Sequence, residues 1–128
     1  MRSHLASGVL ALVLLARPAA VDAGSSERDQ HWQALQQAYY QMNVAEYCGL
    51  ATDEVGDGFR RKIRHLRQWI ALPEAVDLRL RVAAARRVDF EYEDYGLNGY
   101  KKWCARVGDG AVASFLAFRE REIAAGIP

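Results

Sequence analysis

Apolar residues recur at every third or fourth position along most of the chain beyond residue 24. The first such stripe consists of Trp32, Leu35, Tyr39, Met42 and Ala45. This spacing places the apolar side chains on one side of an amphipathic α-helix. Ser25 or Ser26 can cap the start of this helix, and Gly49, directly after Cys48, is a natural stop. We therefore expect a first helix that ends near Cys48.

A second stripe follows a helix-start signal, in which the capping hydroxyl of Thr52 precedes two acids, Asp53 and Glu54. The stripe consists of Val55, Phe59, Ile63, Leu66 and Ile70. Glycines at positions 56 and 58 weaken the first turns, or allow another backbone to approach closely. Pro73 ends the segment and is suited to the first turn of a third helix.

The third stripe lies between residues 74 and 95 and consists of Ala75, Leu78, Val82, Ala85 and Tyr92. Leu78, Leu80 and Val82 also alternate with arginines, which would suit a strand. We favour a helix, because the alanines at 83–85 are strong helix formers and no second strand is evident elsewhere.

Gly96 permits a left-handed turn, after which Asn98 can cap a fourth helix that carries Tyr100, Trp103 and Cys104. The glycines around Asp109 are expected to interrupt this helix, and a last helix follows to about residue 125. The pattern predicts an all-α fold, a small bundle of four to five helices in a single domain, residues 24–128.

The first residues have the form of an export signal. A short basic start precedes an apolar run at 5–16, and Val21 and Ala23 are small residues at the positions that a signal peptidase reads. The run is too short to cross a bilayer, which needs about 20 apolar residues. We expect a signal peptide at 1–23, cleavage after Ala23, and a mature chain without a transmembrane segment. The expected location is the periplasm, with secretion as the alternative.

Charge and cysteine content agree with export. Removing Arg2, Arg17 and Asp22 from the 17 basic and 16 acidic residues of the whole chain leaves a formally neutral domain. Nucleic-acid binding depends on neutralising many phosphates, so we do not expect a nucleic-acid partner. Two cysteines in an exported chain are most simply one disulfide, Cys48–Cys104, that staples the bundle.

The segment from Asp89 to Cys104 is rich in aromatics, carboxylates and glycines. Its aromatics can pack around the disulfide, or they can form a recognition loop, since tyrosine and tryptophan anchor interfaces. The candidate binding residues are Tyr95, Asn98, Tyr100 and Trp103, with Glu91, Glu93 and Asp94.

The same acids invite a calcium or catalytic interpretation. A calcium loop that starts at Asp89 would need glycine at its sixth position and glutamate at its twelfth, where the chain has Asp94 and Tyr100. Glycoside hydrolysis needs two carboxylates opposed across a cleft, which neighbours on one helix rarely provide. We expect no metal, no cofactor and no catalytic residue.

A basic patch of Arg60, Arg61, Arg64 and Arg67 lies on the second helix, and Arg79, Arg81, Arg86 and Arg87 follow on the third. These arginines can pair with the carboxylates of 89–94 inside the same molecule. Otherwise they form a surface for an acidic protein, an anionic envelope polymer or lipid headgroups.

The sequence thus predicts a small exported binding or accessory protein that acts by protein–protein contact in the cell envelope. An inhibitor, an immunity-type partner and an enzyme subunit all fit this description. The alternatives are a small envelope enzyme that uses Glu91 or Glu93, and a metal or cofactor carrier. Its partner would be another envelope protein, and the sequence leaves the oligomeric state open.

Overall fold

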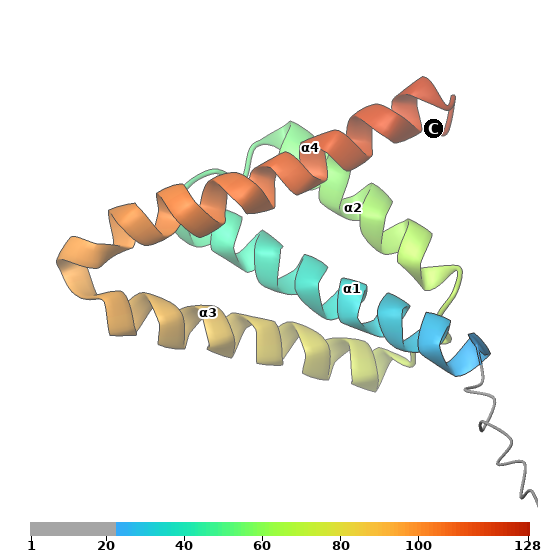
Figure 1. The fold of residues 1–128 in the computed structure, drawn as a ribbon, viewed down its shortest axis with the longest axis horizontal. Helices are drawn as coiled ribbons and strands as arrows, with labels where there is room; N and C mark the ends of the chain where they lie inside the picture. The colour runs from blue at the N-terminus through green and yellow to red at the C-terminus, as the bar shows by residue number, and fades with distance from the viewer. Residues whose placement is uncertain (1–22) are drawn as a thin grey trace, which may run out of the picture.

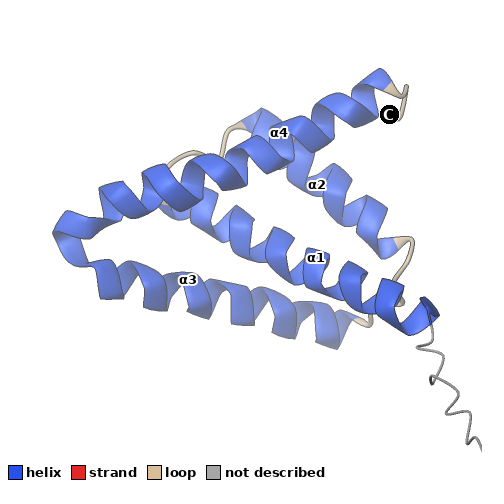
Figure 2. Ribbon diagram, in the orientation of Figure 1, coloured by secondary structure: helices blue, strands red, loops and turns tan. Residues whose placement is uncertain are grey.

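The computed structural model describes residues 23–128; the side chains of Ala23, Ser25 and residues 96–98 are not described. The predicted signal peptide, apart from its last residue, lies outside this part of the chain. In the described residues the fold is all-α, as Figure 2 shows. The segment 78–82, for which a strand was the alternative, is helical. The helices are α1 (Ala23–Tyr47), α2 (Asp53–Arg67), α3 (Glu74–Trp103) and α4 (Asp109–Ala124), with a short π-helix, η1 (Cys104–Gly108), before α4.

The ends of α1 and α2 follow the predicted signals. Gly49 has φ +66°, and the N–H groups of Gly49 and Leu50 bond to the carbonyls of Glu46 and Ala45. This is the hydrogen-bond pattern of a glycine-terminated helix, and here the glycine is required for its left-handed φ. Thr52 caps α2, since its hydroxyl accepts from the N–H of Val55 at 3.3 Å.

The helices form two packed pairs that share a core (Figure 1). α1 lies in the middle with α3 alongside it in the same direction, while α2 and α4 pack on each other. A Cβ built on Gly58 of α2 would lie 2.7 Å from the carbonyl carbon of Phe115, so the absence of a side chain allows α2 and α4 this close approach. The largest fully buried side chains are Trp103, Phe115, Leu35, Val44, Val55 and Val88.

α3 is helical throughout but changes direction sharply near Gly96 and Gly99, at the corner in Figure 1. A Cβ built on Gly99 would lie 3.0 Å from the Cβ of Tyr95, whereas Cβ atoms four residues apart on a regular helix are about 5–6 Å apart. The expected left-handed turn and new cap at 96–98 were therefore wrong in form, although the chain does turn there. Glycine at a kink provides the room for this bend.

The disulfide between Cys48 and Cys104 is formed, and its Cα atoms are 5.5 Å apart. It joins the end of α1 to the start of η1. A Cβ on Gly108 would lie 3.3 Å from the Sγ of Cys48 and 3.0 Å from Leu50, so the backbone of η1 packs tightly on the staple. Among the described helices, none is long and apolar enough to cross a membrane.

Candidate binding site

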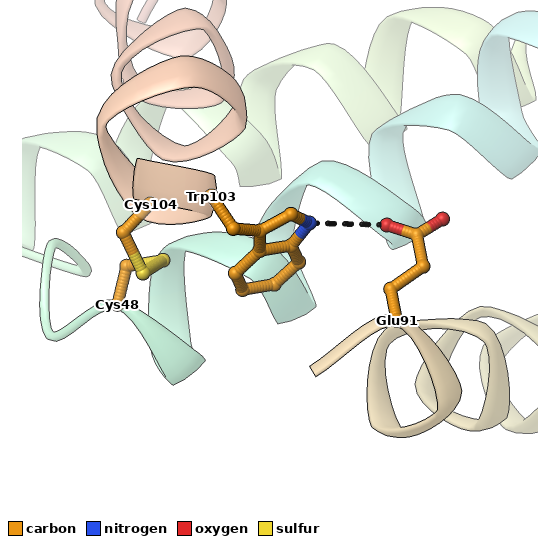
Figure 3. The surroundings of a disulfide bond; sticks show 4 residues. All are labelled: Cys48, Glu91, Trp103 and Cys104. Atoms are coloured by element: carbon orange, nitrogen blue, oxygen red, sulfur yellow. Dashed lines mark hydrogen bonds between the residues drawn. A yellow bond between two sulfur atoms is a disulfide. The ribbon is translucent and has the colours of Figure 1, made fainter. Parts of the chain in front are cut away.

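The predicted binding segment includes the corner around the disulfide, where the indole of Trp103 lies between the disulfide and Glu91 (Figure 3). Glu91 accepts hydrogen bonds from the hydroxyl of Tyr40 at 2.6 Å, from Nε of Arg87 at 2.9 Å and from the indole N–H of Trp103 at 3.3 Å. The guanidinium of Arg87 also lies 3.9 Å from the ring centroid of Tyr40. The carboxylate thus satisfies buried donors from two distant parts of the chain.

This arrangement sets the pKa values of the corner. Burial alone would raise the pKa of Glu91, but the hydrogen bonds from Tyr40, Arg87 and Trp103 hold it below its usual range. Burial and the hydrogen bond to Glu91 raise the pKa of Tyr40 to about 12. The lowered pKa keeps Glu91 ionised at neutral pH, as the acceptor for these three donors.

The other predicted binding residues differ in their exposure. Trp103 is only 1% exposed and packs in the core, so its side chain is not at the surface. Tyr95 is 41% exposed and accepts a hydrogen bond from Arg106 at 2.7 Å, and Tyr100 is half-buried against Tyr92. The side chain of Asn98 lies outside the described residues.

The remaining acids of the segment lie at the surface. Glu93 and Asp94 are exposed, and Asp89 accepts a hydrogen bond from the hydroxyl of Tyr47. No group of three His, Cys, Asp or Glu in the described residues is arranged to hold a metal ion. His31 stacks on Trp69 and His65 packs on Phe118, each with 5.6 Å between the ring centroids. Each histidine therefore contacts an aromatic ring rather than the acidic run.

The basic patch divides into two parts. Arg61 turns toward α4, where it pairs with Asp57 at 2.9 Å and with Glu122 at 3.8 Å and donates to the carbonyl of Ile127. Arg60, Arg64 and Arg67 instead share a hollow of about 400 Å³ with Arg81 of α3, floored by Phe59 and Ile63. The predicted patch is thus three arginines of α2 joined by one of α3.

A second hollow, of about 360 Å³, continues from the first. The two share Phe59 and Arg81, and the second is also lined by Tyr39, Met42, Asn43, Glu46, Val82 and Ala85. We call the two hollows together the α1–α2–α3 groove. All four arginines line the first hollow, and the second adds the carboxylate of Glu46. Asp77 pairs with Arg67 beside the first hollow.

One buried carboxylate holds the two walls of the groove together. Asp77, at the start of α3, accepts from Arg67 of α2 and from Arg81, both at 2.9 Å, and from the hydroxyl of Tyr39 in α1. Burial would raise the pKa of Asp77, but these donors lower it. The guanidinium of Arg81 lies 5.2 Å from the ring centroid of Tyr39, which fixes it at the groove.

The binding residues predicted from the sequence did not include Asp77 or Tyr39. The only local signal was the Asp77–Arg81 spacing of four, which favours an ion pair on one helix face. Arg67 and Tyr39 come from other helices, and no sequence pattern indicates that they meet Asp77.

No family model, curated protein or solved structure matches this chain.

Proposed function

We propose that this chain is an exported binding protein that acts by contact with another protein of the cell envelope through its α1–α2–α3 groove. The observation that carries the proposal is the convergence of Arg60, Arg64, Arg67 and Arg81 on a concave surface with an apolar floor. Arginine and aromatic side chains are enriched where protein interfaces are strongest. An inhibitor, an immunity-type partner or an enzyme subunit would use such a surface.

We expect the partner to be acidic, because the negative charges of Asp77 and Glu46 offset only two of the four arginines. Arg60 has no carboxylate within 4.0 Å among the described residues, and Arg64 donates only to the carbonyl of Pro128. A concave surface between helices suits a protruding protein segment better than a flat lipid bilayer. The disulfide and the lack of a membrane-spanning helix in residues 23–128 are compatible with export.

The experiment is affinity capture from envelope extract with the oxidised protein as bait, followed by mass spectrometry. The groove variant is Arg60→Glu/Arg64→Glu, and the charge-matched control is Lys101→Glu/Lys102→Glu at the corner. We expect one stoichiometric partner on the wild type and on the control, lost with the groove variant. Circular dichroism and a thermal melt establish that each variant is folded.

Other outcomes would assign the function elsewhere. Loss with Asn98→Ala/Tyr100→Ala or with the lysine variant alone would return the contact surface to the corner predicted from sequence. Retention by every variant would exclude both surfaces. Binding to anionic vesicles that depends on Arg60 and Arg64, with no protein captured, would make the groove a lipid-headgroup surface.

A further inference from the structure

The outer side of α3 is free of contact within the described chain. α3 packs on α1 and η1, and it runs along one edge of the molecule (Figure 1). Large apolar side chains are nevertheless exposed on this helix: Leu78 is 61% exposed, Val82 41% and Phe90 71%. Val82 and Phe90 lie eight positions apart, which places them on the same face of the helix.

The residues on this side are arranged symmetrically about Arg86. Val82 precedes Arg86 by four positions and Phe90 follows it by four; Arg79 precedes it by seven and Glu93 follows it by seven. Spacings of four and seven keep all five residues on one face of a helix. We call these five residues the outer face of α3. Its symmetric positions pair an apolar residue with an apolar residue, and a base with an acid.

The charges of the outer face are not used within the molecule. The ion pairs that α3 makes join Arg81 to Asp77 and Arg87 to Glu91, and both carboxylates also bind tyrosines of α1. Among the described residues, Arg79, Arg86 and Glu93 have no oppositely charged group within 4.0 Å. The expected internal pairing of the third-helix arginines with 89–94 therefore occurs only at Arg87 and Glu91.

We propose that two copies of this chain associate through the outer faces of α3, antiparallel about a twofold axis at Arg86. In this arrangement Arg79 of each copy faces Glu93 of the other, and Val82 of each copy faces Phe90 of the other. The interface is isologous, so every contact occurs twice. Arg86 faces its own counterpart at the axis, and the exposed Asp89, one turn away, offsets that repulsion.

A second copy fits this face better than a foreign partner. Arg79 lies at one end of the face and Glu93 at the other, so a uniformly acidic or basic partner would be repelled at one end. An antiparallel copy meets each end with the opposite charge. The face runs from Arg79 to Glu93, about 21 Å of helix. One pair of helices of this length buries less than the roughly 1,600 Å² of a standard interface, so the dimer is weak and reversible.

Sedimentation equilibrium tests the dimer, with protein concentrations from about 5 µM to about 1 mM. We expect self-association that weakens as salt is raised from about 20 mM to about 500 mM. Arg79→Glu and Glu93→Arg should each raise the dissociation constant at least about tenfold, since each puts two like-charged pairs across the interface. The matched controls are Lys102→Glu and Glu120→Arg, exposed residues outside this face that should leave association unchanged.

The strictest test of the antiparallel arrangement is to mix the two single variants. A heterodimer of Arg79→Glu with Glu93→Arg brings two opposite-charge pairs together again, so the mixture should associate as the wild type does. The double variant Arg79→Glu/Glu93→Arg should likewise form a homodimer. A protein that stays monomeric throughout, a dimer insensitive to both variants, or a mixture that does not recover association would each overturn the proposal.

This inference does not rest on the proposed partner-binding function. Val82 borders both surfaces, but Arg79 and Glu93, the residues that the test changes, do not line the α1–α2–α3 groove. A failure of the dimer therefore leaves groove-dependent capture untouched.

Discussion

The indole N–H of Trp103 donates to the carboxylate of Glu91 over 3.3 Å, although twelve residues of one helix separate them. On a straight helix these positions would be about 18 Å apart. The hydrogen bond therefore spans the bend of α3, and it ties the part of that helix before the bend to the disulfide-bonded corner. Tyr40 donates to the same carboxylate, so α1 is included in the connection.

We expect Glu91→Ala to destabilise the fold by about 2–3 kcal/mol, because the buried hydroxyl of Tyr40 and the buried indole N–H of Trp103 would lose their acceptor. Glu91→Gln keeps an acceptor and should cost about half as much. Urea unfolding measures both changes. The exposed neighbour Glu93→Ala should stay within about 0.5 kcal/mol of the wild type. A similar result for Glu91→Ala would contradict the structural role assigned to this carboxylate.

The helices themselves could be predicted from sequence because their signals are local. Gly49 after Cys48, Thr52 before two acids and Pro73 before the third stripe all lie at or next to an observed helix end. The bend of α3 was expected at the right place but in the wrong form. Glycines allow a left-handed turn or a helical kink equally well, and long-range contacts decided between them.

The candidate site was predictable only in part, because its contacts are long-range. The arginine spacing on α2 indicated a basic surface, but not that Arg61 would turn toward Asp57 and Glu122. The addition of Arg81 depends on Asp77 and Tyr39, which meet only after α1 and α3 pack. For Trp103 the sequence left two alternatives open, packing around the disulfide or a place in a recognition loop, and the fold buries its side chain in the core.

A second prediction concerns pH and the two buried carboxylates. The pKa values of Asp77 and Glu91 are lowered in the folded protein relative to their ordinary values of about 4 in an unfolded chain. Their stabilisation is therefore fully present above pH 5 or so, and is lost as the pH falls through the folded-state values below about 4. We expect the free energy of unfolding to decrease steeply below about pH 4.

Asp77→Asn isolates one of these contributions. The variant should be less stable than the wild type at pH 7, and the difference should shrink as the pH is lowered toward 2 or so. Urea unfolding across the pH range measures this convergence. A difference independent of pH would mean that the charge of Asp77 does not act on Arg67 and Arg81 as the geometry implies.

A third prediction tests the close approach of α2 and α4. Gly58→Ala puts a methyl group against the backbone of Phe115, which cannot move away as a flexible side chain can. We expect a loss of about 2–3 kcal/mol in the free energy of unfolding. Gly110→Ala is the matched control, since nothing lies within 4 Å of its Cβ; it should stabilise helix α4 by up to about 1 kcal/mol. Equal effects would show that the two helices are not in backbone contact.

The disulfide provides the last prediction, because its two halves lie 56 positions apart and close a loop that contains all of α2 and α3. Loop-closure entropy for that length corresponds to about 4 kcal/mol. We expect Cys48→Ala/Cys104→Ala to lose about 3–4 kcal/mol in urea unfolding, with a steeper denaturant dependence because the open unfolded chain exposes more surface. Reduction of the wild type should reproduce most of this loss. If the double variant lost less than about 1 kcal/mol, the Glu91 contacts and the packing of Gly108 on Leu50 would hold the corner without the staple.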